Sequence, residues 1–283
     1  MSAKLVMIFC CFLLMAGTAR AEQKLLITDV LDKGQVEAEL DLGYSYTKNS
    51  FTVHSPNFQE GNVVHRDTFT DFSLGLGLGH NLQVGFSVPY VFTDRFSFEY
   101  TNPSGQTYYT KSEGIGDFTI NGSYRLLGNN KEPFVLVAGL DVKLDTASTD
   151  KEGTGTTDYS PYLAVSTQAA RNKLRPYAFC RAVIRNHGAA KDFVLGIGSE
   201  YTPYKDFSLV PFANALIRTN SNSIKGYEVY SFGLQSYIRA EKNVYLVPKA
   251  SYALGSSTST TDNSQDLGGL EGYTLAVGLY YLF

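Results

Sequence analysis

Apolar and polar residues alternate through most of this chain. The first regular run places polar or small residues between Val36, Ala38, Leu40, Leu42, Tyr44 and Tyr46. Successive side chains of a β-strand point to opposite faces, so this period of two predicts two-faced strands. Clear repeats follow at 71–78, 82–92, 117–126, 134–145 and 273–283, and weaker ones at 157–168, 174–185, 191–202, 207–219, 227–239 and 244–254. The sequence therefore predicts an all-β chain of about twelve strands.

The connections between these strands alternate in length. The even-numbered ones have six residues or fewer, and the three longest, 49–61, 94–113 and 255–271, are all odd-numbered. A soluble sandwich has no reason to sort its loops by end, whereas a transmembrane barrel has short turns at one end and long loops at the other. A closed antiparallel sheet also leaves no unpaired backbone edge in hydrocarbon. We therefore predict a transmembrane antiparallel up-and-down β-barrel with its apolar face outward.

For one predicted strand, the alternation does not decide which face points inward. In 174–185, Tyr177 and Phe179 share a face with three arginines, at 175, 181 and 185. Because an unpaired charge in lipid is very costly, we expect the arginine face to point inward and Cys180 to point outward.

Residues 1–21 read as a secretory signal peptide. Lys4 gives the positive start, an apolar stretch follows to Ala16, and Ala19-Arg20-Ala21 forms a small-x-small cleavage site before Glu22. The apolar stretch is too short to cross a bilayer of about 30 Å as a helix, which leaves a membrane anchor as the weaker alternative. After the leader, no apolar run of 18 residues occurs.

Composition narrows the function classes. Of the 283 residues, 20 are Tyr and 18 are Phe, and none is Trp. Many of these aromatic residues fall at predicted strand ends, as in an interfacial girdle. The net charge is −3, which argues against a nucleic-acid partner. Cys10 and Cys11 lie in the leader, so Cys180 alone remains and neither an intramolecular disulfide nor a cysteine zinc site is expected.

The chain ends on Phe283, which closes an alternating strand two residues after Tyr281. This ending resembles the recognition signal of bacterial outer-membrane barrels. The resemblance implies delivery to the outer membrane by the barrel assembly machinery.

Several longer stretches also resemble one family. They are TDFSLGLGLGHNLQVGFSVPYVF (70–92), EGIGDFTINGSYRLL (113–127), FVLVAGLDVKLDTAS (134–148) and GTGTTDYSPYLAVS (153–166). Over 34–283 the chain resembles outer-membrane proteins labelled with the meta-pathway of phenol degradation. Asp145-Thr146-Ala147 stands where that family has Pro-Thr-Gly. The resemblance implies an outer-membrane barrel linked to uptake of organic compounds and assigns no binding residue.

Charged residues on the predicted inner face are the candidate site. They are Glu37, Glu39, Asp41, Asp117, Arg125, Asp141, Lys143, Asp145, Arg181, Arg185, Glu200, Arg218, Arg239 and Lys249. Opposed charges in a pore select solutes by their field. The alternative, which we favour, is a water-lined, salt-bridged interior. Twelve tilted strands enclose a radius of about 12 Å, so only small solutes would pass.

Residues 22–33 precede the first strand and either plug the lumen or hang in the periplasm. With Asp29, Asp32 and Lys33 they have little apolar area to bury, so the periplasm is slightly favoured.

An enzyme needs a nucleophile or an acid–base constellation. The histidines are spread over the first outer loop (His54 and His65), a short turn (His80) and a later loop (His187), without a visible Ser or Asp partner. His54 with His65 is a remote metal alternative. The run Gly75–Gly79 lacks the following helix of a nucleotide loop, so small residues on the inner wall explain it better.

We therefore predict a channel or transporter for small organic solutes, with no cofactor. A lipid- or peptide-hydrolysing barrel and a structural or adhesive surface protein are the alternatives, and adhesion would depend on loops 94–113 and 255–271.

Overall fold

The computed structural model describes residues 26–54, 58–102, 107–129, 132–147, 155–169, 173–186, 190–221 and 224–283, without the side chain of residue 102. The predicted signal peptide, Cys10, Cys11 and His187 lie outside these residues.

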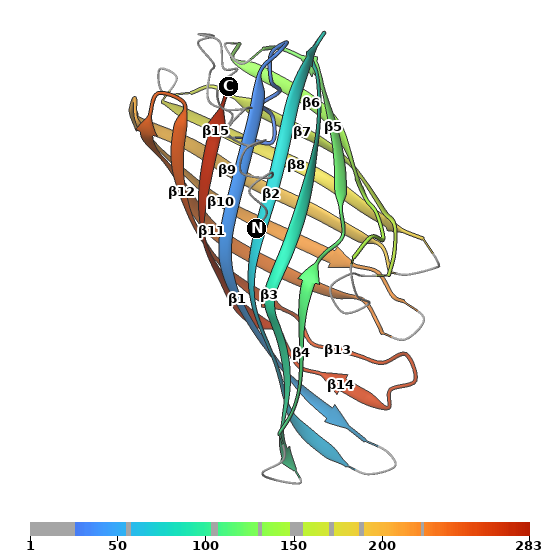
Figure 1. Cartoon of the computed structure of the whole chain (residues 1–283). Coiled ribbons are helices and arrows are strands. Elements are labelled where there is room, and N and C mark those ends of the chain that lie inside the picture. Colours follow the sequence, from blue (N-terminus) through green and yellow to red (C-terminus); the bar gives the residue numbers. More distant parts are fainter. Residues whose placement is uncertain are drawn as a thin grey trace.

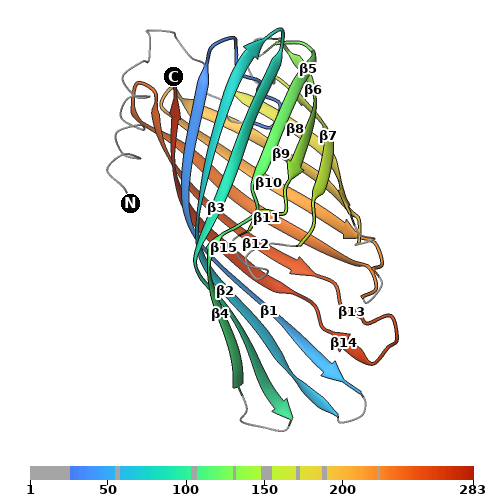
Figure 2. The same cartoon turned by 45° about the vertical axis from the view of Figure 1, so that its right-hand side comes forward.

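The strands run antiparallel around a closed barrel (Figures 1 and 2). Their bounds are β1 Val36–Val53, β2 Gln59–Gly79, β3 Leu82–Asn102, β4 Thr107–Ile115, β5 Thr119–Leu127, β6 Phe134–Lys143, β7 Asp158–Thr167, β8 Leu174–Arg185, β9 Asp192–Tyr204, β10 Phe207–Arg218, β11 Tyr227–Glu241, β12 Val244–Gly255, β13 Thr258–Ser259, β14 Gln265–Leu267 and β15 Glu271–Leu282. Twelve of them form the wall, which closes because β1 pairs with both β15 and β2. Among the described residues no helix is long and apolar enough to cross a membrane.

The apolar face points outward, as predicted. Leu40 and Leu42 of β1 are 47% and 56% exposed, and Leu275, Val277 and Leu279 of β15 are each about half exposed. The uncertain strand, β8, is confirmed in its predicted orientation. Cys180 is exposed on the outer face, while the arginines at 175, 181 and 185 form ion pairs inside. The barrel is therefore inverted relative to a soluble one, with its ionised groups inside.

The two ends of the barrel differ, as the connection lengths predict. At the short-turn end, two-residue turns join β2 to β3, β9 to β10 and β11 to β12. His80 and Asn81 have φ of 52° and 63°, the mirror-image turn whose twist matches that of the flanking strands. The chain also ends here (Figure 1), and we call the opposite end the long-loop end.

The prediction of a long loop at 94–113 is wrong, because strands occupy most of this range. β3 pairs with β5 only over 82–87, and farther along it pairs with β4. Together with the ends of β1 and β2, these strands form a β1–β4 extension (48–53, 59–67, 94–102 and 107–115) that projects from the long-loop end (Figures 1 and 2). The alternation of Asp94, Phe96 and Phe98 with Arg95 and Ser97 carries this signal, which the high polarity of the segment obscured.

A charge on the outer face should test immersion in lipid. We expect Val277→Arg, in the middle of β15, to lower the free energy of unfolding by about 2–4 kcal/mol, and Tyr204→Arg at the short-turn end by at most about 1 kcal/mol. Urea unfolding in lipid vesicles measures both. Equal losses at the two depths would contradict a membrane-spanning wall.

Candidate functional site

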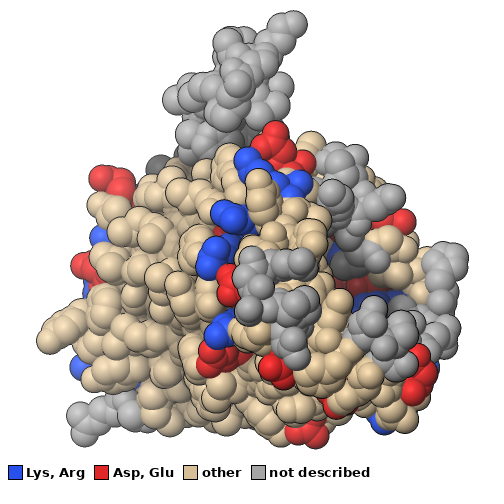
Figure 3. Space-filling model, turned by 90° about the horizontal axis from the view of Figure 1, so that it is seen from below, with Lys and Arg blue, Asp and Glu red and all other residues tan. Residues whose placement is uncertain are grey.

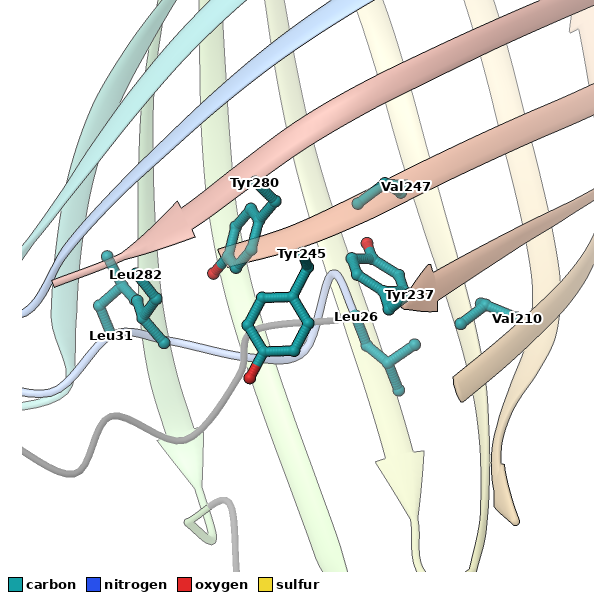
Figure 4. Close-up of a cluster of buried hydrophobic side chains, with 8 residues drawn as sticks. All are labelled: Leu26, Leu31, Val210, Tyr237, Tyr245, Val247, Tyr280 and Leu282. Carbon is teal, nitrogen blue, oxygen red and sulfur yellow. The ribbon is translucent and has the colours of Figure 1, made fainter. Parts of the chain in front are cut away.

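The chain before β1 lies inside the barrel. Leu26 and Leu31 are 4% and 3% exposed, and they pack against inward side chains near the short-turn end (Figure 4). These side chains come from β10, β11, β12 and β15, and they are Val210, Tyr237, Tyr245, Val247, Tyr280 and Leu282. We call residues 26–33 the N-terminal segment.

This position differs from the slight preference for the periplasm. The charged residues of the segment favoured the periplasm, but Leu26, Val30 and Leu31 are buried, and the inner wall completes the apolar surface with tyrosine rings. Tyr237 and Tyr280 are edge-to-face with centroids 6.3 Å apart, and both are almost fully buried. The sequence pattern assigns no role to these inward tyrosines, because alternation alone does not identify the surface that receives the segment.

Polar contacts fix the segment as well. The Arg175 guanidinium forms an ion pair with Asp29 and donates a hydrogen bond to Thr28 Oγ1 at 3.1 Å. Arg125 Nη2 donates to the Val30 carbonyl at 2.7 Å, and the Leu31 amide donates to Gln83 Oε1 at 3.0 Å. Because these anchors come from three separate strands, β3, β5 and β8, they hold the segment across the lumen.

A glycine in the wall lets the segment leave the lumen and join β1. The Gly77 carbonyl accepts from the Gly34 amide at 2.8 Å, and the Gly77 amide donates to the Gln35 carbonyl at 2.9 Å. A β-carbon at Gly77 would lie 1.9 Å from the Asp32 carbonyl oxygen. Glycine is therefore required here for close backbone approach, which agrees with the structural interpretation of the glycine run.

A polar cavity of about 360 Å³ lies next to the segment inside the barrel. The segment contributes Leu26, Ile27 and Asp29 to its lining, and the wall contributes groups that include Glu37, Glu39, Asn121, Ser123, Asp141 and Tyr162. Its size suits a small solute, and the segment bounds it toward the short-turn end.

Acidic side chains outnumber basic ones around the middle of the lumen. Lys249 Nζ lies 2.7 Å from Glu39 Oε1 and 2.6 Å from Asp41 Oδ2. Asp71 stands directly across from Asp41 in the register of β1 and β2. On the other side of the barrel, Asp141 pairs with Arg181 at 3.1 Å. This level of the interior is therefore net negative.

An alternating chain of charges follows the rim at the long-loop end. Asp192 at the start of β9 forms ion pairs with Arg185 Nη2 at 2.6 Å and with Arg218 Nε at 2.7 Å. These two arginines lie at the ends of β8 and β10. Asp158 at the start of β7 lies 3.5 Å from Arg185 Nε and 3.2 Å from Lys143 Nζ. Lys143 also reaches Asp117, at 3.2 Å. The rim network therefore joins six consecutive strand ends, and its formal charges cancel.

The structure places most of the candidate charges on the inner side. Those with inner contacts are Glu37, Glu39, Asp41, Asp117, Arg125, Asp141, Lys143, Arg181, Arg185, Glu200, Arg218 and Lys249. Arg239 instead lies at the short-turn end, where it contacts Asp206 and Tyr245, and Asp145 is exposed in a connection.

Sequence reasoning missed several partners of these charges. Asp158 and Asp192 are the first residues of their strands, just after the connections, and they share the inward parity of the strand. Asp29 was noted only as a polar residue of the N-terminal stretch. The predicted strands 157–168 and 191–202 already contain the first two, and their inward parity is the signal that would have found them.

The histidines do not form one site in the described residues. His54 Nε2 lies 2.8 Å from Asp266 of β14, with both side chains exposed, and His80 is in its predicted turn. His65 Nε2 lies 2.6 Å from Asp94 Oδ1, and its ring stacks on Phe96 at 4.1 Å. Thr47 is opposite His65 and seven residues before His54, which separates the two histidines by about 23 Å along the strand. They therefore do not share a metal ion.

Comparisons with solved structures bear on the fold. The chain is similar to an outer membrane channel from Pseudomonas putida F1, with a TM-score of 0.64 and 13% identity over 93% of this chain and 100% of that one. It also matches the KdgM porin (TM-score 0.44, 12% identity, 85% and 98% covered). A third match is the outer membrane protease OmpT from Escherichia coli (0.40, 12%, 93% and 99%). No protein-family profile and no curated protein sequence matches.

The similarity to the Pseudomonas putida channel is one of fold. The chain therefore has the architecture of an outer membrane β-barrel.

The rim network should contribute to stability. We expect Asp192→Asn to lower the free energy of unfolding by about 3 kcal/mol, because two arginines lose the buried carboxylate between them. The same exchange at exposed Asp145 should change it by less than about 0.5 kcal/mol. Urea unfolding in vesicles provides the measurement. A loss at Asp192 no larger than at Asp145 would show that the network is dispensable.

Proposed function

We propose that this chain is a passive channel of the bacterial outer membrane for small organic solutes, aromatic ones included. One observation carries the proposal: the inner face of the β1–β4 extension is aromatic, and farther along the same strands a polar cavity, bounded by the N-terminal segment, lies inside the barrel. The fold shared with an outer membrane channel supports it.

The inner face of the extension suits aromatic solutes. Phe51, Phe96, Phe98, Tyr100 and Tyr108 share the parity of the inward residues Glu39 and Asp41, through the register of β1 to β4. Phe51 meets Phe98 and Tyr100 edge-on at 6.3 and 5.3 Å. Phe96 and Phe98 are each 37% exposed and Tyr108 is 59% exposed, so their rings present apolar surface to an incoming solute. This route agrees with the uptake of organic compounds that the family label of phenol degradation implies.

The orientation follows the general arrangement of such barrels, with short turns in the periplasm and long loops outside. A cleaved signal peptide would export the chain, and Phe283 would present it to the barrel assembly machinery. In the folded barrel the Phe283 amide donates to the Val36 carbonyl at 2.7 Å, so the signal becomes part of the β1–β15 seam.

The histidines favour a channel over an enzyme. Among the described residues, His65 has a carboxylate partner in Asp94, but no Ser, Thr or Cys side chain is hydrogen-bonded to its ring. A base and a carboxylate without a nucleophile do not make a hydrolytic triad. We therefore propose no catalytic residue, no cofactor and no metal.

The inner charges set which ions pass. Because the acids Glu39, Asp41, Asp71 and Asp141 outnumber the bases Lys249 and Arg181 among the described residues at mid-depth, the pathway should favour cations over anions. This selectivity is secondary to the uptake of neutral solutes.

Removing the N-terminal segment should open the channel. We expect mature protein lacking 22–33 to show a severalfold higher single-channel conductance in planar bilayers than the intact mature chain, with a reversal potential that shows cation preference. Heat-modifiable migration on gels would verify that the shortened barrel folds. Unchanged conductance from a folded variant would remove the segment from the pathway, and no conductance from either protein would reject the channel itself.

The aromatic face should speed uptake of aromatic solutes. We expect Phe96→Ser with Phe98→Ser to slow uptake of radiolabelled toluene severalfold in cells that rely on this protein, and to leave uptake of glycerol unchanged. Phe92→Ser is the matched control. Phe92 lies in the β-bulge next to the Thr68–Thr93 pair, and its exposed ring contacts Tyr90. Equal slowing by the control would mean that the inner rings have no special role.

A further inference from the structure

The outer face of the β1–β4 extension carries a row of cations. Arg66 of β2 pairs with Arg95 of β3, and Arg95 pairs with Lys111 of β4. Paired residues of an antiparallel sheet project to the same face, and strands lie about 4.8 Å apart, so the three charges form a line about 10 Å long. We call Arg66, Arg95 and Lys111 the cation row.

Carboxylates do not neutralise the row. Within the described chain, none of its three side chains lies within 4.0 Å of an Asp or Glu oxygen. The acids on the same face of the extension are Glu113, two residues along from Lys111, Glu99, four along from Arg95, and Glu60, six before Arg66. Like charges directly opposite each other across strands are destabilising. The row therefore lacks a structural explanation within the described protein.

Aromatic rings hold the two guanidinium groups in place. Arg66 Cζ lies 5.7 Å from the centroid of the Tyr46 ring, and Arg95 Cζ lies 4.8 Å from that of Tyr109. A guanidinium stacked on a ring keeps its N–H edges available. Arg95 and Lys111 are exposed. At the long-loop end, basic side chains lie interspersed with acidic ones on the surface (Figure 3).

The row lies level with one edge of the apolar belt. Tyr46, on the same line of the sheet as Arg66, stacks on Tyr273 at 5.4 Å. Farther down the outer face of the same strand come Tyr44, Leu42 and Leu40. Tyrosines at this position mark the level of the lipid headgroups. The cations therefore stand where the headgroup phosphates of the leaflet at the long-loop end would lie.

We infer that the cation row binds the phosphate groups of a glycolipid in that outer leaflet. Arginine pairs with phosphate oxygens in a bidentate manner, and a row of about 10 Å can contact more than one phosphate on a headgroup. The position at the edge of the lipid belt does not favour binding of a soluble anion. A lipid is held at this level by its acyl chains. The inference rests on the proposed outer-membrane location.

The test measures binding of bisphosphorylated lipid A to the detergent-solubilised barrel by native mass spectrometry. We expect the triple variant Arg66→Gln, Arg95→Gln, Lys111→Gln to bind about 100-fold more weakly, since each cation near an anionic lipid surface contributes about fivefold to the affinity. The charge-matched control is Lys173→Gln, Lys205→Gln, Lys242→Gln, which removes three exposed lysines at the short-turn end. The charge-retaining pair Arg66→Lys, Arg95→Lys should keep most of the affinity.

Each other outcome overturns the inference. Equal affinity of the triple variant and the intact protein, or an equal loss in the control, would show that the row is not the site. Undiminished binding of lipid A stripped of phosphate would show that phosphate is not recognised. Displacement by millimolar inorganic phosphate would show a free-anion site. Heat-modifiable migration and conductance, measured on the same samples, report separately on the barrel and on the proposed channel.

Discussion

The seam between β1 and β15 is the interaction on which the rest of this structure depends. In hydrocarbon every backbone N–H and C=O group needs a partner within the protein, so a sheet with two open edges cannot span a membrane. Pairing of Glu37–Lys48 with Glu271–Leu282 joins the first strand to the last and removes both edges. The inverted distribution of apolar and charged side chains follows, because a closed wall has one face toward lipid and one toward its own interior.

The interior that closure creates is narrow, and the chain fills part of it with its own beginning. The tyrosines of the inner wall and the arginines at 125 and 175 together receive a segment that is apolar on one side and hydrogen-bonded on the other. The same enclosure determines the electrostatics. Charged side chains that would be very costly on the lipid-facing side form ion pairs with one another inside the barrel. The balance of acidic and basic groups differs between the middle of the lumen and the rim.

Much of this architecture is visible in the sequence, for a physical reason. Immersion in lipid imposes a strict period of two, so the strand number, the outward face and even the orientation of β8 follow from parity. Contacts that join distant segments leave no periodic trace. The seating of the N-terminal segment depends on Tyr237 and Tyr280, more than 200 residues away, and the charges of the segment by themselves favoured the periplasm. The extension was missed because charged residues on a strand beyond the membrane resemble a loop in composition.

The same distinction between parity and long-range contacts applies to the candidate site. The parity of Glu39, Asp41, Asp141 and Lys249 predicts that they face inward, but which acid meets which base depends on the tilt of the strands and on the register. The partners Asp158 and Asp192 also lie at strand boundaries, where the alternation begins and its signal is weakest.

The rim network has a consequence for assembly. Its members occupy the terminal residues of adjacent strands, with acids where strands start and bases where they end. A slip of one residue between two of these strands would turn a terminal charge toward the acyl chains. Charge complementarity at this edge therefore favours the native register of neighbouring hairpins over a slipped one, which would lose these ion pairs.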